Sequence, residues 1–278
     1  MAQAQPKIPA TFIQPNRGWL SLGFKELWDR RELLYFFAWR DVRSRYKQSL
    51  LGVAWVFIQP LMTMIVFSVL FGRLAKLPSD GVPYPIFTYS ALLGWNLFSQ
   101  SLSRSTSSVV ANGGLVQRVY FPRLLIPTSS ILSVLVDFLI AFLVVFGLMA
   151  YYRYAPTLAI LTLPLFMLMA MGAALGVGLW LSALNVRFRD INHTIPFVIQ
   201  MWMYATPVAY SLNVVPERWH TLYALNPLVG IIEGFRWAIL KTATPGSEVV
   251  VSAIVIVVVL VSGIVFFRRM EKHFADVV

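Results

Sequence analysis

Six long stretches of the sequence carry almost no charge, and they constrain the fold more than any other feature. They cover residues 48–72, 81–103, 124–152, 154–186, 191–216 and 249–267, and Asp137 is the one charged residue inside them. A helix of roughly 20 mostly apolar residues can cross the hydrocarbon core of a bilayer with all its backbone groups paired internally. The pattern therefore predicts an all-α integral membrane protein with six transmembrane helices.

The composition agrees with a bilayer as the main solvent. Charged residues make up 13% of the chain, against about 25% in a typical soluble domain, and the mean hydropathy is +0.70. A net charge of +11 could indicate nucleic-acid binding, but the lysines and arginines lie mostly in short segments between the apolar stretches. We therefore expect membrane lipids around this chain, and no nucleic acid.

The basic residues also predict an orientation. With the N-terminus in the cytoplasm, the inner segments hold 17 lysines and arginines and the outer segments hold 6. Because basic residues accumulate in cytoplasmic segments, both termini are expected to be cytoplasmic. The predicted parts are an N-terminal segment (1–51), a six-span domain (52–267) and a C-terminal tail (268–278).

An amphipathic helix is expected just before the first span. Aromatic and apolar residues recur there at helical spacing, and basic residues form a second row: Tyr35, Trp39, Val42 and Tyr46, beside Arg40, Arg43 and Lys47. Such a helix can lie at the cytoplasmic membrane surface against anionic headgroups. The alternative is an ordinary solvated helix.

A second non-spanning region follows the fifth apolar stretch. Residues 219–232 are uncharged but too few to cross, and Asn226-Pro227 interrupts them. Beyond the break, one helical face carries Leu228, Ile231, Ile232, Phe235 and Ile239. Two short re-entrant helices on the outer side are the expected structure, and a plain outer loop is the alternative.

The common catalytic motifs are missing from the sequence. It contains no GxxxxGK[ST] phosphate loop, no HExxH and no GxSxG, and its three histidines lie far apart in sequence. These patterns are typical of ATP-binding, zinc-protease and serine-hydrolase sites. We expect no catalytic site, no metal site and no cofactor in this chain.

Asp137 is the exceptional residue within the apolar stretches. A carboxylate at the centre of a membrane helix costs about 2.5–3.5 kcal/mol on insertion scales, so it should face protein or water. It could belong to a transport pathway or gate, or it could make a structural hydrogen bond to a neighbouring span.

Four segments, in order along the chain, resemble one known family. They read RDVRSRYKQSLLGVAWVFIQPLMTMIVFSVLFG (40–72), SSVVANGGLVQRVYFPRLLIP (107–127), NVRFRDINHTIPF (185–197) and TPVAYSLNVVPERWHTLYALNPLVGIIEGFRWAIL (206–240). The family comprises the membrane subunits of type-2 ABC exporters of lipid-linked polysaccharide, such as O-antigen, capsule or teichoic acid. The resemblance covers about residues 30–278.

The resemblance implies a homodimer in the inner membrane of a bacterium, bound to two separate ABC ATPases that carry ATP and Mg²⁺. It places a helix that couples to the ATPase at 112–120, with candidate contacts Asn112, Gly113, Leu115, Val116, Arg118, Tyr120 and Arg123. It places paired outer gate helices at 216–223 and 228–240, with candidates Pro216, Trp219, Tyr223, Leu228, Ile232 and Phe235. The alternative for residues 112–120 is a simple connecting loop, which would have a similar sequence.

In this family the first and fifth spans line most of the channel, and here they carry Trp55, Phe57, Gln59, Gln200, Trp202, Tyr204 and Tyr210. Trp55 and Gln59 are four residues apart, as are Gln200 and Tyr204, so each pair shares a helix face. The alternatives are helix–helix hydrogen bonds by the glutamines and an interfacial aromatic belt.

Competing functions are export of a drug or a simple lipid by the same scaffold, a membrane-embedded sugar transferase and a passive channel. The transferase would need clustered acids or a metal site, whereas the outer acidic residues are scattered along the sequence.

Overall fold

The computed structural model describes residues 28–47, 52–119 and 121–274, and these residues form helices joined by short connections. The longer helices are α2 (Arg31–Lys47), α3 (Ala54–Phe67), α4 (Tyr84–Ala111), α6 (Leu125–Tyr152), α7 (Leu163–Arg187), α8 (Asp190–Tyr204), α10 (Pro227–Leu240) and α11 (Ser247–Met270). The shorter ones are η1 (Ser68–Leu74), α5 (Gly113–Arg118), η2 (Leu158–Thr162), η3 (Leu212–Val214), η4 (Glu217–Trp219), α9 (His220–Tyr223) and η5 (Glu271–His273). The described part of the chain is all-α, as predicted, with no strand in those ranges.

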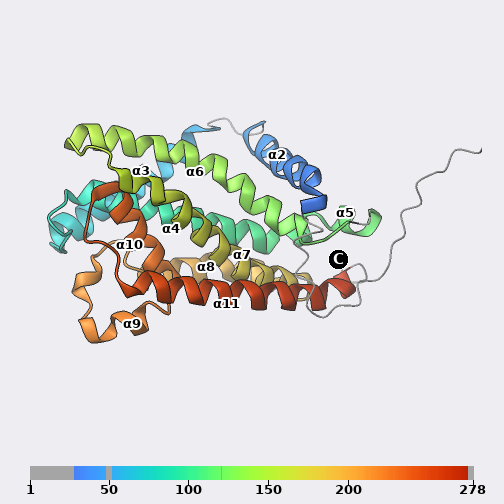
Figure 1. Ribbon diagram of the computed structural model, residues 1–278. Coiled ribbons are helices and arrows are strands. Elements are labelled where there is room, and N and C mark those ends of the chain that lie inside the picture. Colours follow the sequence, from blue (N-terminus) through green and yellow to red (C-terminus); the bar gives the residue numbers. More distant parts are fainter. Residues whose placement is uncertain (1–27, 48–51, 120, 275–278) are drawn as a thin grey trace, which may run out of the picture.

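Long helices run side by side and give the molecule two distinct ends (Figure 1). The helices α6, α7 and α11 extend along its length; α5 and the end of α11 lie at one end, and α9 and α10 lie at the other. The elements predicted to be cytoplasmic therefore gather at one end, and those predicted to be external gather at the opposite end.

Four helical segments, among the described residues, are long and apolar enough to cross a membrane: Ala54–Leu74, Leu125–Tyr152, Leu158–Arg187 and Ser247–Met270. The other two expected spans correspond to α4 and α8. Helix α4 has 28 residues and is less apolar, while α8 has 15 residues, fewer than the roughly 20 that a span requires. These four helices support the assignment to the membrane class, and the number of six membrane spans remains a prediction.

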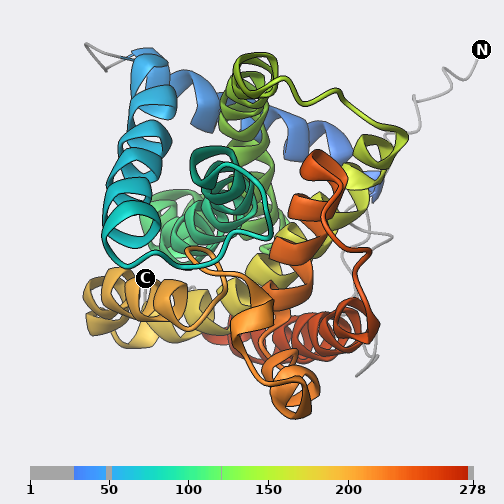
Figure 2. The ribbon, with the colours of Figure 1, turned by 90° about the vertical axis from the view of Figure 1, so that its left-hand side faces the viewer.

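The polarity of α4 has a structural reason. This helix lies at the centre of the bundle (Figure 2) and contacts α3, α6, α7, α8 and α10. Its serines and threonines, such as Ser101, Ser105 and Thr106, are buried against protein. A helix surrounded by other helices does not have to dissolve in lipid, and small polar residues allow close packing. Its lower hydropathy therefore reflects its central position.

Glycines permit the closest helix contacts. A Cβ on Gly176 of α7 would meet the backbone of Leu260 of α11 at 2.8 Å, and Gly263 of α11 lies directly against Gly176. Such close approach of backbones is the usual way in which helices associate in a membrane, where apolar burial supplies no driving force between them. The α7–α11 pair therefore depends on these two glycines.

Candidate functional site

A buried ionic cluster joins α2 to the bundle at Asp137. The Asp137 side chain is 5% exposed, and its two oxygens accept hydrogen bonds from the Arg45 guanidinium and the Tyr46 hydroxyl. The Arg104 guanidinium of α4 lies 3.8 Å from the same carboxylate, and Arg45 also donates to Ser133 at 2.9 Å. Three helices, α2, α4 and α6, therefore meet around one carboxylate.

The cluster explains how a charge is tolerated on an apolar helix. Burial and the hydrogen bond to Asp137 raise the pKa of Tyr46 to about 12, so its hydroxyl stays protonated and donates. The intramembrane charge is thus paired with Arg45 and Tyr46, which belong to the predicted interface helix. Sequence reasoning missed Arg45 and Arg104, because their pairing with Asp137 joins residues far apart in sequence.

The family resemblance places the interface helix at residues 35–49. It corresponds to α2, which ends at Lys47; residues 48 and 49 lie outside the described residues. Tyr35, Trp39, Arg43 and Lys47 are exposed, whereas Val42 is buried and Tyr46 is half-buried. The apolar row expected from spacing is therefore divided between two faces. One faces the bundle, and the other is outward, aromatic and basic.

The predicted coupling segment forms α5, and it is tied to α2. The Asn112 side chain accepts a hydrogen bond from Arg40 at 2.8 Å and donates to the Ser108 carbonyl at 2.8 Å. Its backbone carbonyl accepts from the amides of Leu115 and Val116. Asn112 therefore connects the end of α4, the start of α5 and the interface helix.

The faces of α5 differ from what position alone indicates. Val116 is 5% exposed and packs in a cluster with Phe37, Val109 and Phe121, with Leu115 against it, and Gly113 is also buried. Arg118 and Val119 are exposed, while Arg123 is half-buried over the Phe274 ring. Tyr120 lies outside the described residues. A partner docking on α5 would meet the Arg118 side, and Val116 anchors the helix.

The candidate channel residues divide into exposed and packed groups. Trp55 and Gln59 on α3 are exposed, as are Gln200 and Tyr204 on α8, and Figure 2 shows α3 and α8 along the same side of the molecule. Phe57 is half-buried. The exposed pairs thus lie where another subunit or a substrate could contact them.

Two further channel candidates are held by protein partners. The Trp202 indole donates to Asn226 at 3.0 Å and packs edge-on against Phe98. The hydroxyls of Tyr210 and Tyr223 lie 2.5 Å apart, and Tyr223 also donates to the Ala205 carbonyl at 2.8 Å. These contacts fasten the end of α8 to α9 and to the start of α10.

The predicted outer gate helices differ strongly in burial. Pro216 and Trp219 are exposed and Tyr223 is half-buried, whereas Leu228, Ile232 and Phe235 of α10 are fully buried. Helix α10 starts at Pro227, where the Asn226 side chain accepts from the Leu228 amide at 3.2 Å. It packs against α4, α7 and α11, so its apolar face belongs to the core of the bundle.

A buried arginine holds the connection between α8 and α10. Arg236 is fully buried, donates to the carbonyls of Val208 at 2.9 Å and Tyr210 at 3.1 Å, and pairs with Glu233 at 2.8 Å. Its guanidinium lies 3.8 Å from the centre of the Phe87 ring. Sequence reasoning counted Arg236 only as an outer positive charge, since neither burial nor loop contacts can be read from spacing.

Asp80 fastens the same connection from the other side. Its carboxylate accepts from the Ser211 hydroxyl and from the Asn213 amide at 2.9 Å. Together, Arg236 and Asp80 hold residues 208–213 against α10 and the loop before α4. The end with α9 and α10 thus contains a bonded polar network that links segments far apart in sequence.

The architecture defines a multi-pass helical membrane protein with the short helix α5 at one end and the buried helix α10 at the other. The family model for the ABC-2 type transporter matches residues 32–240, which is most of the chain. The chain therefore belongs to the ABC-2 type transporter membrane family.

Individual relatives narrow the comparison. The chain is 29% identical, over 256 residues, to the O-antigen export system permease protein RfbA of Myxococcus xanthus, covering 91% of this chain and 97% of that protein. It is 25% identical to the protein of the same name from Klebsiella pneumoniae, covering 88% and 95%. It is 22% identical to the polysialic acid transport protein KpsM of Escherichia coli, covering 84% and 91%.

Proposed function

We propose that this chain is the membrane subunit of an ATP-driven exporter that moves a lipid-linked polysaccharide across the inner membrane of a bacterium. The observation that carries the proposal is the similarity, along most of both chains, to permeases named for O-antigen export and polysialic acid transport. The bundle with two different ends supports it, because a transport subunit needs one end for its energy source and another for release.

The proposed working unit contains two copies of this chain and two ABC ATPases. ATP and Mg²⁺ would bind to the ATPases, and the present chain would act as a permease without a catalytic site. The proposed docking surface is the exposed side of α5 with Arg118, together with Val119 directly after the helix. The side with α3 and α8 is proposed to face the second copy and the channel, since it carries the exposed Trp55, Gln59, Gln200 and Tyr204.

The experiment tests α5 by charge reversal. Arg118→Glu should release the ATPase from the affinity-purified permease and stop polysaccharide export, because a docking surface that gains an opposed charge loses electrostatic complementarity. Arg218→Glu is the matched control for ATPase association: it makes the same charge change at an exposed position near α9, at the opposite end of the molecule, and should leave ATPase recovery unchanged. Full ATPase recovery and normal export with Arg118→Glu would contradict the docking proposal.

The cargo is tested separately. In cells that lack this chain, the polysaccharide should accumulate inside and disappear from the surface, while resistance to drugs stays unchanged. Normal surface polysaccharide together with increased drug sensitivity would instead assign the scaffold to drug export. A relative named only as the inner membrane transport permease YadH of Escherichia coli, 27% identical over 74% of this chain, makes this second arm necessary.

A further inference from the structure

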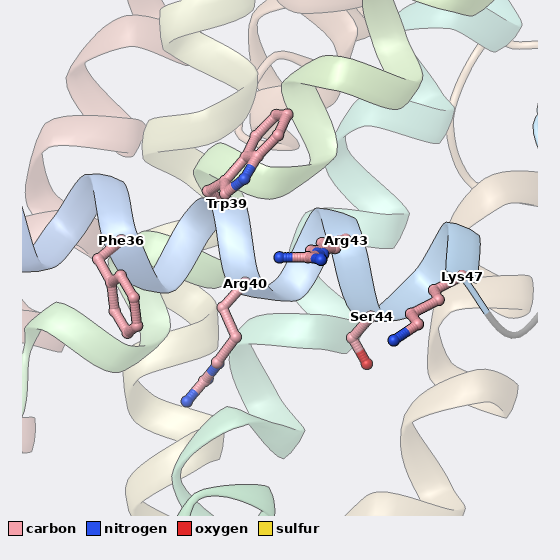
Figure 3. Close-up of a pocket in the computed structure, with 6 residues that line it drawn as sticks. All are labelled: Phe36, Trp39, Arg40, Arg43, Ser44 and Lys47. Carbon is pink, nitrogen blue, oxygen red and sulfur yellow. The ribbon is translucent and has the colours of Figure 1, made fainter.

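The outward face of α2 forms a groove that has no role in the proposed transport function. Its volume is about 370 Å³, and the described residues that line it all belong to this helix: Phe36, Trp39, Arg40, Arg43, Ser44 and Lys47. They recur at spacings of three and four residues, so they lie on one broad face of the helix. Figure 3 shows Trp39 projecting to one side of this face, Phe36, Arg40, Ser44 and Lys47 projecting to the other side, and Arg43 between them. The groove thus combines aromatic and basic side chains.

The bundle holds this face in a defined direction. On the opposite side of α2, Phe37 and Val42 are buried, and Arg45 and Tyr46 bind the carboxylate of Asp137. The helix cannot roll about its axis without breaking these buried contacts. The orientation of the groove is therefore fixed by packing.

The cations of the groove are not equivalent. Arg40 is engaged by Asp41 at 2.9 Å and by Asn112 at 2.8 Å. Arg43 and Lys47 are exposed and, within the described ranges, make no ion pair or hydrogen bond with protein. They are four residues apart, so their side chains project from neighbouring positions. Two uncompensated positive charges therefore lie beside Ser44, at the end of the groove away from Phe36.

The aromatic part of the groove is strongly exposed. The exposed fractions are 59% for Phe36 and 55% for Trp39. The amphipathic ring of tryptophan is typical of the boundary between headgroups and acyl chains. A ligand that satisfies the whole groove must present an anion to Arg43 and Lys47 and an apolar chain to Trp39 and Phe36.

We propose that this groove is a binding site for the phosphodiester of an anionic phospholipid of the cytoplasmic leaflet. The Arg43 guanidinium can take two phosphate oxygens at once, and Lys47 adds a compact positive charge. Ser44 supplies a hydroxyl donor, and the upper part of an acyl chain lies along Trp39. Free phosphate would leave both aromatic rings in water, which favours a lipid. The site rests on the proposed function in one respect, because it assumes that α2 lies at the cytoplasmic membrane surface.

The test measures lipid binding by the purified full-length chain in detergent. Phosphatidylglycerol and phosphatidylcholine are titrated separately, and bound lipids are counted by native mass spectrometry. The unmodified chain should retain phosphatidylglycerol in preference. Arg43→Gln combined with Lys47→Gln should bind phosphatidylglycerol about thirtyfold more weakly, because both charge-assisted contacts to the phosphate are lost.

The matched control removes two other exposed charges. Arg73→Gln with Lys76→Gln makes the same change in net charge near the opposite end of the chain's first apolar helix, and it should leave phosphatidylglycerol binding intact. Glycerol phosphate, added at millimolar concentration, should not displace the lipid, because it lacks the acyl chains that Trp39 would contact.

Three outcomes would overturn the site: equal retention of the two lipids, equal loss in the control variant, or displacement by glycerol phosphate. The measurement uses neither the ATPase nor the polysaccharide. A failure of the lipid site is therefore distinguishable from a failure of the export proposal, which is read from surface polysaccharide in cells.

Discussion

Removal of the Asp137 carboxylate should destabilise the protein strongly, and the size of the loss depends on whether its partner Arg45 keeps its charge. Asp137→Leu leaves the Arg45 guanidinium, whose side chain is 18% exposed, without its counter-charge. Breaking one partner of a buried ion pair costs about 3–5 kcal/mol, because an uncompensated charge remains in a poorly solvated place. We expect a loss of this size in the free energy of unfolding.

The double variant separates charge from packing. Replacing both partners of a buried pair by apolar residues is often neutral, so Asp137→Leu with Arg45→Leu should recover most of the loss. The recovery should be incomplete because Arg104, at 3.8 Å from the carboxylate, keeps its charge. Its side chain is 35% exposed, which lets water compensate part of it.

The assay is a double-mutant cycle, with unfolding measured in mixed detergent micelles by circular dichroism. The cycle isolates the coupling between the two residues, which should amount to several kcal/mol in this contact. If Asp137→Leu unfolds within about 0.5 kcal/mol of the unmodified chain, the range of ordinary surface substitutions, the ionic cluster does not hold α2. The cluster also means that lost export in Asp137→Leu alone would not place Asp137 on a transport path.

Three further outcomes follow from the structure. For orientation, Ser247→Cys should react with a membrane-impermeant thiol reagent on intact cells, and Gly114→Cys should react only after permeabilisation. Both positions are exposed, at opposite ends of the molecule, and the chain has no cysteine of its own. The reverse pattern would invert the topology. For the channel, Trp55→Ala and Tyr204→Ala should each lower export while the ATPase still co-purifies. Tyr151→Ala, at an exposed position on α6, should leave export unchanged. Unchanged export in the Trp55 and Tyr204 variants would remove these residues from the lining. For helix packing, Gly176→Val should lower the free energy of unfolding by about 1–3 kcal/mol through overpacking. Gly147→Ala, with nothing within 4 Å of its new Cβ, should be tolerated. Equal melting temperatures of the two variants would contradict the close α7–α11 contact.

The sequence by itself determined the class of fold, because insertion of a helix into a bilayer depends on the hydropathy of about 20 consecutive residues, which is a local property. The break at Asn226-Pro227 was also readable, and α10 begins there, since a proline favours the first position of a helix. The four resembling segments indicated the exporter family, which the family model and the named relatives confirm.

The tertiary structure decided which side of each helix faces protein. Spacing placed Tyr35, Trp39 and Tyr46 in one row, yet Tyr46 turns to the bundle because Asp137, far along the chain, accepts its hydrogen bond. Position suggested Val116 for docking, but packing against Phe37 and Phe121 buries it.

The same reason explains α4 and Arg236. Helix α4 is more polar than a lipid-facing span because other helices surround it, and Arg236 is buried because carbonyls of a distant connection satisfy its guanidinium. Local composition cannot encode such pairings, since they depend on where several helices meet. Residue roles that arise from one segment were therefore readable in advance, and roles that arise between segments were decided only by the folded bundle.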